Sequence, residues 1–324
     1  MIELKHINKS FRVAKRGAGL KEAAKALFHR EYTEVKALQD VSFTIGDGEM
    51  VGYIGPNGAG KSSTIKIMSG VLTPDSGQCI INGRTPWLDR KEHVAQIGVV
   101  FGQRSQLWWD VPVADSFELL RDIYRVEPGD YRTTLEELTE LLSLQELLQT
   151  PTRQLSLGQR MRCEIAASLL HRPKILFLDE PTIGLDAVSK IAVREIVRSV
   201  NRAYGTTVIL TTHDMQDIEA LTDRILLIGK GRILMDGSLE QLKNRNSHHK
   251  TLTVDYIGNI RLIPEGMEQV KDLDGHGEFW VDTRVISVSD AISSLSSQVE
   301  VKDIGITGES IDQTVVSLYK EFAI

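Results

Sequence analysis

The feature that most constrains the fold is a glycine-rich run between an apolar strand-like segment and a helical pattern. The run covers residues 55–62 and reads Gly-Pro-Asn-Gly-Ala-Gly-Lys-Ser, after the apolar segment 49–54 and before the helical pattern 62–68. Glycines let the backbone bend so that successive N–H groups point at an anion, and the following helix adds its positive N-terminal end. This context predicts a loop that holds the phosphates of a nucleoside triphosphate.

The residues of this loop have separate expected parts in binding. The lysine of such a loop, Lys61, reaches the β- and γ-phosphates, and the next hydroxyl, Ser62, binds Mg²⁺. A purely structural glycine turn is the alternative interpretation, and the strand-to-helix context argues against it. The predicted ATP-binding set of the loop is Gly55, Pro56, Asn57, Gly58, Ala59, Gly60, Lys61, Ser62 and Ser63.

Length and composition allow one large domain and a small one. The 324 residues are 41% apolar and 25% charged, as in ordinary globular proteins, and no run approaches the length of an apolar membrane span. The start of the chain lacks the plan of a signal peptide. Cys79 and Cys163 lie in apolar patterns and are expected to be buried thiols rather than a disulfide. These features favour a cytoplasmic protein that reaches a membrane only through a partner.

Charge is unevenly distributed along the chain. The net charge of −6 argues against a dedicated nucleic-acid binder, so no nucleic acid is expected as a partner. Residues 12–36 hold seven basic and three acidic side chains, whereas residues 241–324 hold eight basic and thirteen acidic ones. The basic stretch is interpreted as an insertion between two strands, with an amphipathic helix over residues 20–28.

Apolar patterning predicts an α/β fold followed by a smaller domain. The runs 175–178 and 207–211 are typical of strands buried on both faces of a parallel sheet, and a helix is predicted between them over 188–203. Residues 241–250 are polar enough for a linker, and residues 251–324 are expected to form a small α+β domain. The other predicted elements are strands at 2–7, 41–45, 49–54, 78–82 and 96–101, helices at 113–126 and 134–148, the second with a capping box at Thr133–Glu136, and a hairpin at 225–236.

Two acidic residues close one of the buried strands. Asp179 ends the strand and Glu180 follows it, 118 and 119 residues after Lys61. An acidic residue at such a strand end can hold Mg²⁺ through water, and the next carboxylate can polarise an attacking water. The sequence therefore predicts Asp179 as a metal residue and Glu180 as the base. The alternative is a pair of acids that only favours the start of a helix.

Leu155–Gln159, ahead of the helical pattern 160–170, resembles the signature motif of ATP-binding cassette (ABC) ATPases. The resemblance covers about residues 1–240 and departs from the family at Leu157, where glycine is commoner. The phosphate-facing N–H groups and the Ser156 hydroxyl do not need that glycine. The family's motifs follow in order: Walker A at 55–63, Gln103 in the Q-loop, the signature at 155–159, Walker B at 175–180, the D-loop at 184–186 and His213 as the switch histidine.

The resemblance implies a P-loop NTPase cassette with a mixed sheet core and a helical subdomain at about 104–165. It also implies that two copies, or this chain and a homologous ATPase, pair around ATP. Each ATP then meets one subunit's phosphate loop and the other subunit's signature. The implied residues are Glu180, His213 and Gln103 in catalysis, Ser62, Gln103 and Asp179 on Mg²⁺, and Ser156, Gly158, Gln159 and Asp186 on the partner's ATP.

Several further assignments rest on the same resemblance. Phe11 is expected to stack on adenine, with a core aromatic at a strand end as the alternative. Trp108 and Trp109 are expected to line the groove that receives a membrane subunit, or else to belong to the core. Independently of the resemblance, His171, His248 and His249 are interpreted as solvent or packing histidines, because no companion ligands stand at metal spacing.

The motif wording looks like that of ABC-2 type exporter ATPases, particularly bacterial multidrug or viologen-type efflux systems. This predicts an ATPase at the cytoplasmic face of the plasma membrane, held there by ABC-2 type permease subunits and driving export. The alternatives are an exporter of cell-wall polysaccharide or lipid-linked glycan, and a soluble ABC ATPase of repair or translation.

Overall fold

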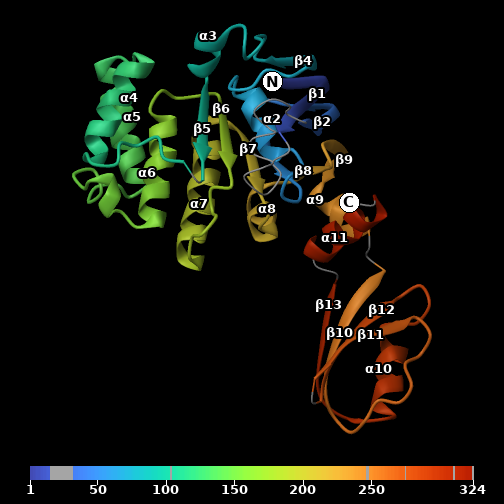
Figure 1. Cartoon of the computed structure of the whole chain (residues 1–324). Coiled ribbons are helices and arrows are strands. Elements are labelled where there is room, and N and C mark those ends of the chain that lie inside the picture. The colour runs from blue at the N-terminus through green and yellow to red at the C-terminus, as the bar shows by residue number, and fades with distance from the viewer. Residues whose placement is uncertain (15–31, 103, 246–247, 274, 309–310, 323–324) are drawn as a thin grey trace, which may run out of the picture. The chain divides into compact units, whose positions relative to one another are not determined.

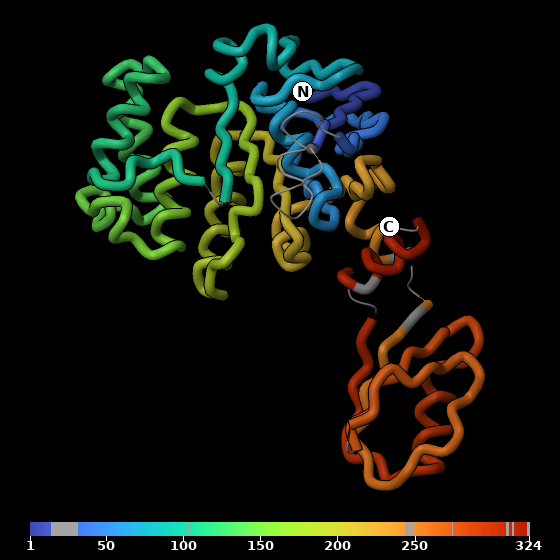
Figure 2. Tube along the Cα trace, in the orientation of Figure 1, coloured from blue at the N-terminus to red at the C-terminus, as the bar shows by residue number. Residues whose placement is uncertain are grey.

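The computed structural model describes residues 1–14, 32–102, 104–245, 248–273, 275–308 and 311–322. The chain divides into two units, Met1–Gly237 and Ser238–Ile324, each of which is described by itself. Figures 1 and 2 show the ribbon and the Cα trace from the same side. The helix predicted over residues 20–28 lies outside the described residues.

A six-stranded sheet forms the centre of the first unit, in the order β5-β6-β7-β3-β8-β9. Its first five strands run parallel where β5 pairs with β6, β6 with β7, and β7 and β8 with β3. The two-residue turn between β8 and β9 suits only an antiparallel pair, so the sheet is mixed. The strands are β3 (Met50–Ile54), β5 (Ile97–Phe101), β6 (Ile175–Asp179), β7 (Thr207–Thr212), β8 (Arg224–Gly229) and β9 (Arg232–Ser238).

A second, antiparallel sheet in the order β2-β1-β4 belongs to the same unit. Its strands are β1 (Ile2–Ala14), β2 (Tyr32–Ile45) and β4 (Ser76–Ile81). The predicted insertion at 12–36 is therefore too wide, because Arg12 pairs with Glu34 and Ala14 pairs with Tyr32 as strand residues. Apolar residues of both sheets and of helix α2 share one core, which includes Leu4, Phe43, Tyr53, Ile65 and Phe177.

Helices surround the six-stranded sheet in the first unit (Figure 1). They are α2 (Lys61–Met68), α3 (Arg90–Val94), α4 (Val113–Tyr124), α5 (Pro128–Leu141), the short 3₁₀ helix η1 (Thr152–Gln154), α6 (Leu157–Leu169), α7 (Ala187–Tyr204) and α8 (Met215–Leu221).

The predicted helix at 134–148 is wrong in both of its bounds. Helix α5 begins at Pro128, where a proline costs nothing because the first N–H groups of a helix have no partner within it. Thr133 is inside the helix and its hydroxyl donates to the Gly129 carbonyl, so the predicted capping box does not form. The helix ends at Leu141, and Ser143 adopts a positive φ of 51° just beyond it.

In the second unit, the described residues form a four-stranded antiparallel sheet, in the order β11-β12-β10-β13, and the helices α9, α10 and α11. Helix α10 covers a core that includes Leu252, Val254, Phe279 and Val281. Helix α9 occupies residues predicted as a linker. The elements are α9 (Leu239–Arg245), β10 (His249–Ile257), β11 (Met267–Leu273), β12 (His276–Asp282), α10 (Val288–Ser296), β13 (Glu300–Gly308) and α11 (Ile311–Glu321).

Candidate active site

The glycine-rich loop joins β3 to α2 and is closely enclosed by neighbouring backbone. A Cβ atom at Gly55 would lie 2.5 Å from the Ile228 carbonyl oxygen, and one at Gly60 would lie 2.7 Å from the Ala37 carbonyl oxygen. Gly58 and Gly60 also have positive φ values of 81° and 115°. The turn therefore requires glycine at these positions, as the sequence predicts.

Lys61 is the first residue of α2 and its amine turns back into the loop. Its Nζ donates to the Gly55 carbonyl oxygen at 2.6 Å and lies 3.3 Å from that of Pro56. Burial lowers the pKa of Lys61, while the negative charges of Glu180 and Asp179 oppose that effect. The amine is therefore held at the loop with two carboxylates near enough to favour its charged form.

The carboxylates reach this point because β3, β6 and β7 end at the same edge of the sheet. Asp179 pairs with Thr211 across the parallel strands β6 and β7. The Thr211 hydroxyl donates to Asp179 Oδ1 at 2.5 Å, and the Glu180 N–H lies 3.1 Å from the Thr211 hydroxyl oxygen. Thr211 is a site residue that the sequence reasoning missed. Its only signal in the sequence is its position two residues before His213.

Glu180 is held in a backbone conformation that few residues with a side chain adopt. Its φ is 55°, and its N–H also donates to the Thr211 carbonyl oxygen at 2.9 Å. Such strain is concentrated at functional sites. A Cβ atom at Gly102 would lie 2.2 Å from the Glu180 carbonyl oxygen, so the end of β5 also approaches Glu180 closely.

His213 follows β7 and completes the group. Its Nδ1 lies 3.6 Å from Glu180 Oε1, and its side chain is 59% exposed. A cavity of about 630 Å³ brings together Asn57 and Ser62 with Asp179, Glu180 and His213. This arrangement offers a cation, backbone donors, two carboxylates and an imidazole to a bound phosphate.

The oxygen atoms at this edge fit Mg²⁺. The Ser62 hydroxyl lies 3.4 Å from Asp179 Oδ1. Among the described residues, no cluster of three or more His, Cys, Asp or Glu side chains could hold a metal ion by itself. Mg²⁺ in nucleotide sites is held by one or two protein oxygens together with phosphates and waters, so this small set is the expected one.

The signature residues are at the start of α6, and they do not line this cavity. Ser156 caps α6, with its hydroxyl accepting from the Gln159 N–H at 3.2 Å while the Gln159 side chain accepts from the Ser156 N–H at 2.8 Å. A Cβ atom at Gly158 would lie 2.3 Å from the Ser189 hydroxyl, and Asp186 accepts from the Ser189 N–H at 2.8 Å. The signature and the start of α7 therefore pack against each other.

The predicted adenine-stacking residue, the Q-loop glutamine and the two tryptophans remain to be placed. Phe11 is 37% exposed on β1, with Lys9 Nζ 5.8 Å from its ring centroid, so it is not a core aromatic. Gln103 lies outside the described residues. The Trp108 and Trp109 side chains are 42% and 53% exposed, so neither belongs to the core.

The histidine and cysteine predictions have clear outcomes. His171 is a packing residue, stacked on Tyr124 with ring centroids 3.8 Å apart and bonded to the Ile97 carbonyl oxygen at 2.9 Å. Cys79 and Cys163 are buried free thiols, as predicted.

A buried carboxylate joins the two segments that flank the catalytic edge. Asp217 of α8 is fully buried and accepts from the hydroxyls of Thr182 and Thr212. Arg194 of α7 donates to the other oxygen of Asp217 at 2.6 Å. Thr182 follows Glu180 and Thr212 precedes His213, so this carboxylate fixes the neighbours of both.

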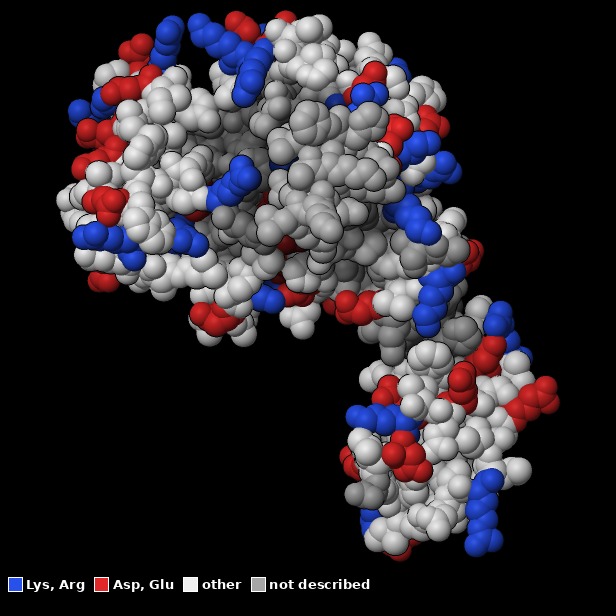
Figure 3. All heavy atoms as spheres, in the orientation of Figure 1, with Lys and Arg blue, Asp and Glu red and all other residues white. Residues whose placement is uncertain are grey.

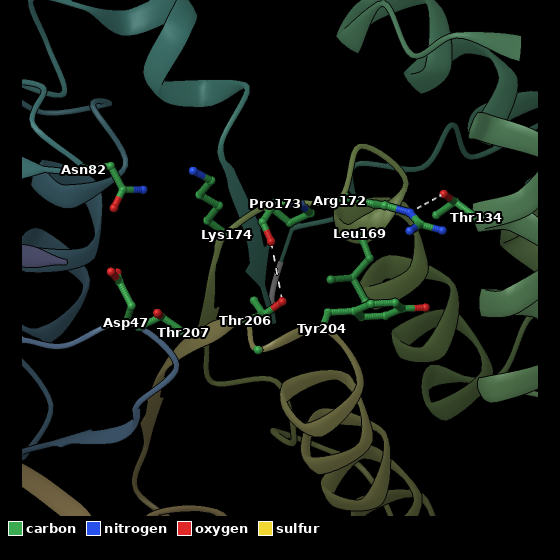
Figure 4. A pocket seen from close by; sticks show the side chains of 11 residues that line it. Asp47, Asn82, Thr134, Leu169, Arg172, Pro173, Lys174, Tyr204, Thr206 and Thr207 are labelled. Carbon is green, nitrogen blue, oxygen red and sulfur yellow. Dashed lines mark hydrogen bonds between the residues drawn. The ribbon is translucent and has the colours of Figure 1, made fainter. Parts of the chain in front are cut away.

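A second cavity, of about 410 Å³, lies at the opposite edge, where β6 and β7 begin (Figure 4). Its Arg172 already donates to the Thr134 hydroxyl and to Glu137, both at 2.8 Å. Ligands of parallel α/β sheets bind beyond the carboxyl ends of the strands. The cavity beside Lys61, and not this one, is therefore the candidate active site.

Comparisons with known proteins agree with this geometry. The sequence pattern of the family described as "ABC transporter" matches residues 38–183. The chain is 31% identical over 208 residues to the ABC transporter ATP-binding protein NatA of Bacillus subtilis. These aligned residues cover 64% of this chain and 84% of NatA. It is 28% identical over 288 residues to the linearmycin resistance ATP-binding protein LnrL of the same organism, covering 88% of this chain and 92% of LnrL.

A solved structure has the same fold as the first part of the chain. It is the dimeric post-hydrolysis state of the ATP-binding cassette MJ0796 bound to ADP and Pi, with a TM-score of 0.61 and 27% identity. The match covers 74% of this chain and 99% of that cassette.

Proposed function

Because this chain belongs to the family of ABC transporter ATP-binding proteins, we propose that two copies close around two ATP molecules and drive a separate permease that exports a drug or another amphiphile. The chain is an ABC transporter ATPase. The observation that carries the proposal is that Asp179, Glu180 and His213 line one cavity with Ser62, at the carboxyl edge of the sheet, and that both carboxylates act on the charge of the neighbouring Lys61.

Binding begins at the glycine-rich loop. The N–H groups at the start of α2 have no partners inside the helix and point toward the phosphates, and Lys61 adds its charge. Ser62 and Asp179 would hold Mg²⁺. When bound, Mg²⁺ would supply positive charge that stabilises the negative charge developing on the phosphates.

Hydrolysis uses the carboxylate of Glu180 as the general base. Its backbone is fixed by two bonds to Thr211, so the carboxylate is directed into the cavity and accepts a proton from the attacking water. His213, 3.6 Å from the same carboxylate, is near the position of the γ-phosphate and orients the base. Gln103 keeps the role that the resemblance implies, a contact with the metal ion and with the attacking water.

The pairing proposal follows from where the signature lies. The residues that line the cavity beside Lys61 do not include Ser156, Gly158, Gln159 or Asp186 among those described. The capped start of α6 nevertheless has the properties of an anion site, with free N–H groups and a positive helix end. A second copy related by a two-fold axis would bring its own signature to each ATP.

The proposal of a membrane partner rests on two exposed tryptophans and on the similarity to transporter ATP-binding proteins. None of the described helices is long and apolar enough to cross a bilayer. Trp108 and Trp109 are exposed aromatic side chains of the kind that anchor protein interfaces. We assign them to the contact with ABC-2 type permease subunits, which would hold the ATPase at the cytoplasmic face of the plasma membrane.

The direction and the cargo of transport rest on similarity alone. LnrL is named for linearmycin resistance, and its similarity extends over most of both chains, including residues of the second unit. This favours efflux over the alternatives of glycan export and of a soluble ABC role.

On the face drawn in Figure 3, basic and acidic side chains are scattered among uncharged ones over the described atoms, without a continuous surface of one sign.

The decisive experiment replaces the base. Glu180→Gln keeps the size of the side chain and removes the proton acceptor, so turnover should fall about 10²- to 10⁴-fold while ATP binding remains. Gel filtration with ATP and Mg²⁺ should then show a stable dimer. Glu195→Gln on α7, an exposed residue, is the matched control and should behave as wild type. A variant that stays monomeric with ATP, or that turns over normally, would refute the proposal.

A further inference from the structure

Helix α6 carries a buried carboxylate that the proposed reaction does not use. Glu164 is 4% exposed. Burial raises the pKa of Glu164, and hydrogen bonds from residues 105–107 oppose that shift. Burying a carboxyl group is costly unless its oxygen atoms are bonded, so the residues that bond it are informative.

Among the described residues, the hydrogen bonds to the Glu164 carboxylate come from the segment that follows Gln103. The Ser105 hydroxyl donates to one carboxylate oxygen, and the Gln106 N–H donates to the other at 3.1 Å. The Gln106 side chain also donates to the Glu164 carbonyl oxygen, at 2.9 Å. Leu107 completes the turn, because its N–H donates to the Ser105 hydroxyl oxygen at 3.1 Å. The segment therefore donates three hydrogen bonds to Glu164 of α6, two to its carboxylate and one to its carbonyl oxygen.

Of the two exposed tryptophans that follow, Trp109 contacts the same helix, whereas the Trp108 N–H donates to the Ser116 hydroxyl of α4 at 3.1 Å. The Arg160 guanidinium lies 5.9 Å from the Trp109 ring centroid, and the Arg153 N–H donates to the Trp109 carbonyl oxygen at 3.0 Å. Arg160 directly follows the signature residue Gln159. Segment 105–109 thus contacts α6 at Arg160 and again at Glu164, over a little more than one helical turn.

We propose that Glu164 is a positioning residue that fixes segment 105–109 to the signature helix, so that ATP engaged by Ser156 and a partner docked on Trp108 and Trp109 influence each other through α6. The inference rests on the proposed pairing around ATP. Ser156 is eight residues before Glu164, or about 12 Å along a rigid helix. A displacement at either end of this stretch is therefore passed to the other end.

Coupling between two sites is reciprocal, so the test does not need the permease. The chain has four tryptophans, and Trp87→Phe with Trp280→Phe leaves Trp108 and Trp109 as the emitting residues. These changes are made in the Glu180→Gln background. The emission change on adding ATP and Mg²⁺ is recorded together with the dimer fraction by gel filtration and light scattering.

Three substitutions and a control distinguish loss of the hydrogen bonds between Glu164 and segment 105–106 from a general disturbance of α6. Glu164→Ala should reduce the ATP-induced emission change by at least about half at equal dimer fraction, because Trp109 then loses its bonded link to the signature helix. Glu164→Gln keeps one acceptor and should restore most of the change. Ser105→Ala removes a donor from the loop without touching the helix, and should reduce it as well. Ser168→Ala, buried one turn further along α6, is the control and should respond as the parent.

The outcomes are distinct. An unchanged emission response in Glu164→Ala, at the same dimer fraction as the parent, would overturn the positioning role while leaving the paired ATPase intact. An equal loss in Ser168→Ala would overturn it too, because any change in α6 would then suffice. A parent that forms no dimer with ATP would refute the proposed function, and this inference with it.

Discussion

At the scale of single residues, Thr211 controls the two acidic residues of the site. Its hydroxyl donates to Asp179 and lies within hydrogen-bond distance of the Glu180 N–H, while its carbonyl oxygen accepts from the same N–H. The side chain is fully buried, so water cannot replace it easily. One hydroxyl therefore orients the proposed metal residue and supports the strained backbone of the proposed base.

Thr211→Val should lower ATP turnover about 10- to 100-fold, the usual effect of removing a hydrogen-bond partner of a ligand or base. Valine keeps the shape of threonine, so the fold should remain and the loss should be chemical. Steady-state ATPase assays at saturating ATP measure it. Thr211→Ser retains the hydroxyl and should stay within a few-fold of wild type; an equal loss in both variants would contradict the role given to the hydroxyl.

Residues whose proposed roles depend on neighbours along the chain could be identified from the sequence. Lys61 and Ser62 come directly after Gly60, and Asp179 and Glu180 close an apolar run. Thr211 and Glu164 have partners far away in the sequence, and their roles depend on strand register and helix packing. A threonine in a buried strand and a glutamate in a helix are ordinary residues until those contacts are known.

At the scale of elements, basic side chains of α7 donate hydrogen bonds to oxygen atoms of α8 and of its N-cap residue. Lys190 donates to Asp214 and Arg194 donates to Asp217, both at 2.6 Å, and Arg198 donates to the Ala220 carbonyl oxygen. The Asp217 carboxylate is the most buried member. The pair of helices thus holds the segments after Glu180 and before His213 in fixed positions.

Asp217→Ala should destabilise the first unit by about 3–5 kcal/mol, because it leaves the Arg194 guanidinium buried without its main partner. For a unit of this size the melting temperature should fall by about 10 °C. Differential scanning calorimetry measures the change. Asp223→Ala, at an exposed position beyond α8, is the control; similar melting temperatures for both variants would mean that the buried bonds contribute little.

His171 links three elements and should make stability depend on pH. It follows α6, stacks on Tyr124 of α4 and bonds the Ile97 carbonyl oxygen of β5. Burial lowers its pKa to about 4, against about 6.5 in an unfolded chain. The unfolded state therefore takes up a proton first, and the contribution of His171 is complete above pH 6.5 and is lost as the pH falls toward 4.

Between pH 7 and pH 5, this difference should remove about 2 kcal/mol from the free energy of unfolding. His171→Phe keeps an aromatic ring beside Tyr124 and has no proton to gain. Urea unfolding at the two pH values should show a loss in the variant that is smaller by that amount. The same loss in both proteins would show that His171 is not the group that titrates.

Most elements could be predicted where the pattern is local and unbroken. The apolar runs of β6 and β7 and the helix α7 between them have nearly the predicted bounds. Helix α5 was predicted wrongly because Thr133 and Glu136 have the spacing of a capping box, while Pro128 five residues earlier is the true start. The segment thus contains two local patterns that are typical of a helix start, and the helix begins at the first of them.

At the scale of the whole molecule, the two units have separate cores. Phe279 is fully buried in the second core, which shares no residue with the core around Tyr53. Phe279→Ala should cost about 3–5 kcal/mol and unfold a unit this small, whereas ATP affinity should be unchanged. Limited proteolysis together with ATP titration measures both.

Trp280, the next residue along β12, is the matched control. Its side chain is 42% exposed on the other face of the sheet, so Trp280→Ala should leave the second unit resistant to protease. Loss of ATP affinity together with the fold of the second unit would contradict the independence of the two cores.

The close approach of Gly158 to Ser189 also has a consequence for inheritance. In the proposed dimer, the signature and the D-loop would reach a partner's nucleotide together, so damage in one subunit would impair its neighbour's site rather than its own. In a cell that makes normal and defective copies equally and pairs them at random, only about one pair in four would be free of the defect. Mutations at this contact should therefore behave as dominant alleles.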